Sequence, residues 1–174
     1  MRSTSVPIPA LDPPWPEALK IALVTSSDTR LGWRMFAHEV AAAVHPGGDS
    51  FPLAERIPPR DGTQHDRTAF LHRHADRVCG YLCLANRLIS GWRSPSAGFR
   101  HATEAERIIR PCIMVVWVDV QLRRRDVARQ LVDAATRHAG VTPSGLAWAE
   151  PFTDSGYLMA QSISPDGLWI ADYS

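Results

Sequence analysis

The chain has 174 residues, of which 45% are hydrophobic, and its formal net charge is +1. This length and composition predict a single globular domain, and the balanced charge gives no reason to expect a nucleic acid or a membrane surface as a partner. No apolar run approaches the roughly 18 residues of a membrane span, and residues 1–16 lack the apolar core of a secretory signal.

The three cysteines, Cys79, Cys83 and Cys112, are an odd number without the spacing of a disulfide-stapled domain. They favour a reducing compartment, and we expect the protein in the cytoplasm. Cys79 and Cys83 are four residues apart within one predicted strand, which predicts that both lie on one face as small core residues.

The chain begins with residues 1–16, which contain five prolines and predict a lead-in to a domain at 17–174. Residues 18–27 predict a strand. A helix should then begin near Asp28, with Ser27 or Asp28 as its cap and a stop at the His-Pro-Gly-Gly segment. One face of this helix is expected to carry Leu31, Met35, Val40 and Val44.

The middle of the chain predicts a loop and then a β-hairpin. Residues 49–66 are rich in proline and charge, which is typical of a loop that covers a substrate. Residues 67–92 predict two strands around a tight turn at Ala75 and Asp76. Residues 93–106 predict another loop.

A strand at 108–120, interrupted by Pro111, leads into a helix at 124–139 that should end at Gly140. The elements expected after it are a strand at 144–152, a short helix at 154–163 and a terminal strand at 168–174. Strands and helices that alternate in this way predict an α/β (α+β) domain built on one mixed sheet.

Three arginines, Arg123, Arg124 and Arg125, stand where the strand at 108–120 passes into its helix. The helix has an apolar stripe for packing on the sheet: Val127, Ala128, Leu131, Val132, Ala135 and Ala139. Its free N–H groups and dipole favour an anion, and arginines beside them favour phosphate. The alternative is a solvated basic edge that binds nothing.

The segment Arg123–Ala128 resembles the pyrophosphate loop of the GNAT acetyltransferase superfamily, which reads Gln/Arg-x-x-Gly-x-Gly/Ala. The final small residue is present as Ala128, whereas Asp126 replaces the middle glycine. The resemblance implies a GNAT-like acyl-CoA N-acyltransferase fold, with a mixed twisted sheet flanked by helices.

A narrower likeness is to the acetyltransferase domain of the sister-chromatid cohesion (Eco/ESCO-type) acetyltransferases, and it extends from Leu19 to Ser174. It is carried by "VWV" at Val116–Val118, "RRDVA" at Arg124–Ala128 and "AEPFTDSGY" at Ala149–Tyr157. That family's zinc finger has no counterpart in residues 1–16, and Ala149 stands at its active-site serine. We therefore expect a compact bacterial relative with a different acceptor.

The resemblance implies acetyl-CoA as cosubstrate and assigns two groups of residues to its site. The strand and loop that would hold acetyl-CoA comprise Val116, Trp117, Val118, Arg124, Arg125, Asp126, Val127, Ala128 and Arg129. Glu150 aligns with a catalytic aspartate and would accept the proton of the amine. Asp133 aligns with a second carboxylate, although helix periodicity predicts that it faces solvent. Tyr157 and Tyr173 are candidates for the general acid.

No metal is expected, because His72 and His74 share a strand face without a third ligand in register. The favoured acceptor is a small-molecule amine, such as an antibiotic or a biosynthetic intermediate, since no protein-targeting module is evident. A protein lysine is the alternative with the same chemistry, and a non-catalytic CoA-binding or assembly module is the alternative from another class. The sequence leaves a homodimer open.

Overall fold

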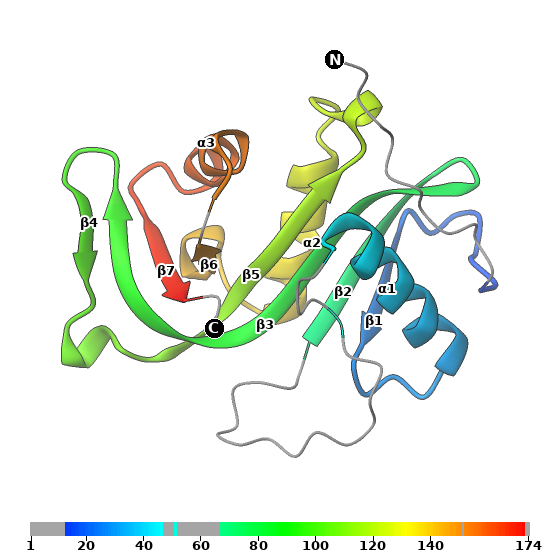
Figure 1. The fold of residues 1–174 in the computed structure, drawn as a ribbon, viewed down its shortest axis with the longest axis horizontal. Helices are drawn as coiled ribbons and strands as arrows, with labels where there is room; N and C mark the ends of the chain where they lie inside the picture. Colours follow the sequence, from blue (N-terminus) through cyan, green and yellow to red (C-terminus); the bar gives the residue numbers. More distant parts are fainter. Residues whose placement is uncertain (1–12, 47–50, 52–66, 151, 173–174) are drawn as a thin grey trace.

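The hydrophobic segments of the chain form a mixed, twisted sheet with helices on both faces (Figure 1). The computed structural model describes residues 13–46, 51, 67–150 and 152–172. The strands, in chain order, are β1 (Ile21–Thr25), β2 (Arg67–His74), β3 (Arg77–Ser94), β4 (Gly98–His101), β5 (Ile109–Val118), β6 (Ala147–Glu150) and β7 (Leu168–Asp172). The helices are α1 (Leu31–Val44), α2 (Val127–Ala139) and α3 (Asp154–Ile163).

The strand order is β1-β2-β3-β5-β6-β7, and β3 also pairs with β4 and β7. The pairs from β1 to β5 are antiparallel, whereas β5–β6 and β6–β7 are parallel. The mixed α+β sheet predicted from the sequence is therefore confirmed. In the described part of the chain, no helix has the length and apolar character needed to cross a bilayer.

The predicted hairpin is confirmed, because β2 and β3 meet at a turn in which Ala75 has a φ of 53°. The predicted loop at 93–106 is wrong in its first part. β3 runs on to Ser94, and Gly98, with a φ of 70°, begins β4, which pairs back onto β3. The four residues of β4 are all exposed. Their sequence therefore lacks the alternation of apolar and polar residues that predicts a half-buried strand.

Helix α1 begins three residues later than predicted and buries a different face. Its N-cap is Arg30, while Asp28 accepts hydrogen bonds from the backbone and side chain of Arg30. Leu31 and Met35 are 55% and 46% exposed. The buried residues are Trp33, Arg34, Phe36, Ala37, Val40 and Ala41. The large aromatic side chains determine the orientation, because they remove the most apolar area from water.

Two hydrophobic clusters cover the two faces of the sheet. The α1 face, named for the helix that packs on it, includes Tyr81, Cys83, Cys112 and Ala149. The α2 face is covered by α2 and α3. Helix α2 starts at Val127 rather than at Arg124, and its buried stripe contains Val127, Leu131, Val132 and Ala135, as predicted. It ends as predicted at Gly140, whose N–H donates to the carbonyls of Arg137 and Thr136.

The prediction that Cys79 and Cys83 share a face is wrong. His72 pairs with Gly80 and Arg73 with Val78, so Cys79 is an extra residue in β3. This bulge shifts the alternation by one position. Cys79 therefore packs on the α2 face and Cys83 on the α1 face.

Gly80, next to this bulge, allows α2 to approach β3 closely. A Cβ at this position would lie 2.7 Å from Cγ1 of Val127 and 3.0 Å from Cδ1 of Leu131. We expect Gly80→Ala to lower the free energy of unfolding by about 1–3 kcal/mol through overpacking, measured by urea denaturation. Gly32→Ala is the control, since a Cβ there meets nothing within 4 Å and should stabilise α1 by up to about 1 kcal/mol. Equal stability of the two variants would contradict this account.

Several predicted features lie outside the described residues. They are most of the lead-in, the loop at 49–66 apart from Phe51, and Tyr173. Of the lead-in, Trp15 is described, and its ring centroid lies 5.3 Å from that of Trp33. The end of the lead-in thus packs against the domain core beside α1.

Candidate functional site

The strands β5 and β6 pair at only two positions and then separate. The pairs are Cys112 with Ala147 and Ile113 with Trp148. Directly beyond them, Met114 is an extra residue in β5, because Ile113 pairs with Leu84 and Val115 with Cys83. Such a bulge bends the strand that contains it. We call the resulting opening, between β5 from Met114 onward and the end of β6, the fork.

The β5 edge that faces the fork directs backbone groups away from β3. The N–H of Asp119 donates to the carbonyl of Cys79 on β3, at 2.8 Å. Because successive backbone groups of a strand point to opposite sides, Trp117 also directs its N–H and C=O toward β3. Val116 and Val118 direct theirs into the fork. Trp117, assigned with them to cofactor binding, instead packs its side chain on the α1 face.

The loop after β5 places an open helix N-terminus beside this edge. Arg124 and Asp126 have φ values of 69° and 59°, the left-handed conformation that glycine adopts most readily. Asp126 thus keeps the backbone geometry typical of glycine at a cost of about 1–2 kcal/mol. Its side chain does not cap α2, and the first helical bond runs from Gln130 N–H to the Asp126 carbonyl.

The N–H groups of Val127, Ala128 and Arg129 therefore have no intrahelical acceptor. Arg123, Arg124 and Arg125 are exposed around them, and Nε of Arg123 donates to the Val118 carbonyl at 3.4 Å. Among the described carboxylates, none pairs with the Arg124 or Arg125 side chain. The predicted strand, loop and helix start are thus contiguous at the end of β5. The three arginines make this surface positively charged.

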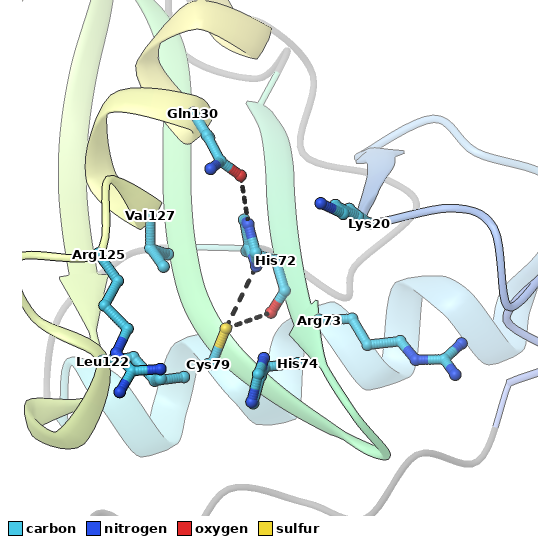
Figure 2. A pocket seen from close by; sticks show the side chains of 9 residues that line it. All are labelled: Lys20, His72, Arg73, His74, Cys79, Leu122, Arg125, Val127 and Gln130. Atoms are coloured by element: carbon cyan, nitrogen blue, oxygen red, sulfur yellow. Dashed lines mark hydrogen bonds between the residues drawn. The ribbon is translucent and has the colours of Figure 1, made fainter.

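A pocket of about 210 Å³ lies beside this loop (Figure 2). Across it, Nε2 of His72 donates to Oε1 of Gln130 at 2.8 Å, and Nδ1 of His72 lies 3.2 Å from Sγ of Cys79. The pocket is lined by Lys20, His72, Arg73, His74, Cys79, Leu122, Arg125, Val127 and Gln130. The charged side chains of this lining are all basic, so the pocket extends the positive potential of the loop.

Sequence reasoning missed this network, because His72 and Gln130 are 58 positions apart and neither lies in a motif. His72 is 6% exposed, whereas His74 is exposed. In the described segments, no group of three or more His, Cys, Asp or Glu side chains is arranged to hold a metal ion. His72 instead connects β2 and β3 to the first turns of α2.

Cys79 belongs to this network, and burial raises the pKa of its thiol to about 11. Burial also raises the pKa of the Cys112 thiol, and Cys83 is buried as well. The thiolate is the reactive form of cysteine. We therefore expect no labelling of the folded protein by a thiol reagent at pH 8, and three labelled thiols after denaturation. Rapid labelling of one thiol in the folded protein would contradict this.

Glu150, the last residue of β6, forms an ion pair at the fork. Nε and Nη2 of Arg93, on β3, donate to its Oε1 at 3.0 and 2.5 Å, and each side chain is 31% exposed. No described residue donates to Oε2 of Glu150. The guanidinium thus holds the carboxylate in place and leaves one oxygen available.

The other two predicted catalytic residues lie on helices. Tyr157, on α3, is half-buried, and its hydroxyl accepts a hydrogen bond from Nε2 of Gln161 at 3.0 Å. Asp133 is exposed on α2, as helix periodicity predicts. Among the described residues, no hydrogen bond joins the side chains of Glu150, Tyr157 and Asp133. The roles assigned to them remain predictions.

No protein-family model matches the chain, and no curated protein matches it in sequence. Solved structures do match. One is the xEco2 acetyltransferase domain bound to a K105-CoA conjugate, at 21% identity and a TM-score of 0.60, covering 88% of this chain and 93% of that chain. Another is the xEco2 acetyltransferase domain itself, at 21% identity and a TM-score of 0.59, with coverages of 88% and 91%.

The chain has the GNAT acetyltransferase fold. The resemblance inferred from the motifs at Val116–Val118, Arg124–Ala128 and Ala149–Tyr157 is confirmed at the level of the fold. What the fork binds and catalyses has to be argued from its residues, because folds are shared among functions.

Proposed function

We propose that the protein is an acetyltransferase that transfers the acetyl group of acetyl-CoA to an amine. The observation that carries the proposal is the continuity of the fork with the open N-terminus of α2. The backbone groups of Val116 and Val118 could pair with the amide groups of an extended pantetheine arm. The N–H groups of Val127–Arg129, with Arg124 and Arg125, would bind the pyrophosphate. The CoA conjugate held by the xEco2 domain supports this assignment.

The reaction would take place where β5 and β6 separate. The amine nitrogen attacks the thioester carbonyl, and its proton passes to the free oxygen of Glu150, directly or through water. Collapse of the tetrahedral intermediate expels the CoA thiolate, which takes a proton from Tyr157. Arg93 positions the Glu150 carboxylate throughout this sequence.

For the acceptor, we propose a small-molecule amine, with the reaction located in the cytoplasm of a bacterium. A protein lysine is the second candidate, favoured by the K105-CoA conjugate bound to the xEco2 domain. The test is to incubate the protein with acetyl-CoA and a panel of amines and lysine peptides, and to follow thiol release. Turnover of small amines supports the first acceptor class, and turnover of peptides alone supports the second. CoA binding without turnover of any acceptor would instead identify a non-catalytic CoA-binding module.

Asp126 is relevant to how well this loop binds CoA, because its carboxylate lies where the phosphates would bind. Asp126→Gly should raise the unfolding free energy by about 1 kcal/mol, since glycine tolerates a φ of 59°. It should also tighten acetyl-CoA binding by several fold, measured by calorimetry, because it removes a like charge. Asp126→Asn separates the two effects, since it removes only the charge. Weaker binding by both variants would mean that the Asp126 carboxylate itself supports the ligand.

A further inference from the structure

A second cationic site lies on the α1 face, between β3 and β5. Arg87 and Arg110 stand directly opposite each other in the register of these two strands. Arg87 alternates with Ala85 and Ile89, which belong to the α1-face cluster, and its side chain therefore points to that face. It is only 7% exposed.

Neither guanidinium forms an ion pair within the described part of the chain. The Nε atoms of Arg87 and Arg110 are both buried without a hydrogen-bond acceptor, and no described carboxylate pairs with either side chain. The Arg110 guanidinium lies 4.7 Å from the centroid of the Trp169 ring. Like charges directly opposite each other on two strands repel, and a buried cation without a partner is costly. A buried polar group of this kind usually has a ligand, an ion or a water as its partner.

Arg87 and Arg110 lie a short distance along the sheet from the start of the fork. Arg110 precedes Cys112, where β5 meets β6, by two residues, and Met114 is two residues further on. The run from Arg110 to Met114 is thus about 13 Å along β5. Helices α2 and α3 cover the other face of the sheet. Arg87 and Arg110 therefore lie on the face of the sheet opposite to α2 and α3.

We propose that Arg87 and Arg110 bind a carboxylate group, which belongs to the acceptor amine. A carboxylate matches the planar donor pairs of guanidinium groups, and one placed between two of them relieves their repulsion. The carboxylate site follows from the arginines alone, and its assignment to the acceptor rests on the proposed acetyl transfer. The substrate class is then an amino acid or another amine with an acidic group.

The site is tested by calorimetry on the full chain at fixed ionic strength, without CoA. The probes are 6-acetamidohexanoate, its neutral primary amide and inorganic phosphate. We expect the carboxylate to bind about tenfold or more tightly than the amide, as for a charge-assisted bond. Arg87→Gln and Arg110→Gln should each remove this preference, whereas Arg107→Gln, at an exposed arginine, should keep it. Equal binding of the carboxylate and the amide, or tighter binding of phosphate, would overturn the proposal.

A thermal melt of Arg87→Met gives a readout that is independent of binding. Removal of an uncompensated buried charge should leave the melting temperature of the ligand-free protein unchanged or raise it. A clear fall would mean that Arg87 has a partner within the protein, and would overturn the site. Carboxylate binding without acetyl transfer would overturn the proposed function and leave the site intact. Transfer to amines without any carboxylate preference would overturn only the inference.

Discussion

Replacement of Glu150 by glutamine should lower kcat by about 10²–10⁴-fold, the usual contribution of a general base. This corresponds to roughly 3–5 kcal/mol in the activation barrier. Glutamine keeps the shape of the side chain and can still accept the hydrogen bonds from Arg93, but it cannot take the proton of the amine. Acetyl-CoA affinity, measured by calorimetry, should stay the same, because the α2 N-terminus is unaffected.

A matched substitution on α2 provides an internal check. Asp133→Asn is the matched control, since it makes the same kind of change on the exposed face of α2. It should leave kcat within a few fold of the parent. A loss at Asp133 as large as that at Glu150 would favour the family alignment over helix periodicity, and an unchanged kcat in Glu150→Gln would remove Glu150 as the base.

Arg125→Ala should weaken acetyl-CoA binding by about 10–100-fold, the loss expected for one charge-assisted contact of roughly 1.5–3 kcal/mol. Arg125 stands at the open N-terminus of α2 and also lines the basic pocket beside it. Isothermal titration calorimetry at physiological salt measures the effect. Arg137→Ala, at an exposed arginine in the last turn of the same helix, is the charge-matched control. If both variants bind acetyl-CoA like the parent, the arginine cluster is a solvated edge.

The parts of the fold that the sequence predicts well are those with a strong local signal. The apolar stripe of α2 and the stop at Gly140 predict that helix, and the polar turn at Ala75 predicts the hairpin. The arginine loop pointed to the helix start that forms the candidate anion site. The sequence predicts the start of α2 three residues too early, because the left-handed φ values at Arg124 and Asp126 are not evident from residue type.

The features that were missed depend on contacts between distant segments. The bulges at Cys79 and Met114 are fixed by pairing with neighbouring strands, and the residue types at these positions do not predict a bulge. The ion pair of Glu150 with Arg93 spans 57 positions. The opposition of Arg87 and Arg110 follows from the register of β3 and β5. Each of these arises from tertiary structure and is therefore absent from local patterns.

The central claim is that acetyl-CoA binds along the fork and at the N-terminus of α2. Calorimetric titration of the full chain with acetyl-CoA tests it most directly. The account predicts saturable binding with one site per chain, together with a gain in stability of about 2.7 kcal/mol at a hundred times Kd. The absence of both heat and a shift in melting temperature at millimolar acetyl-CoA would contradict it.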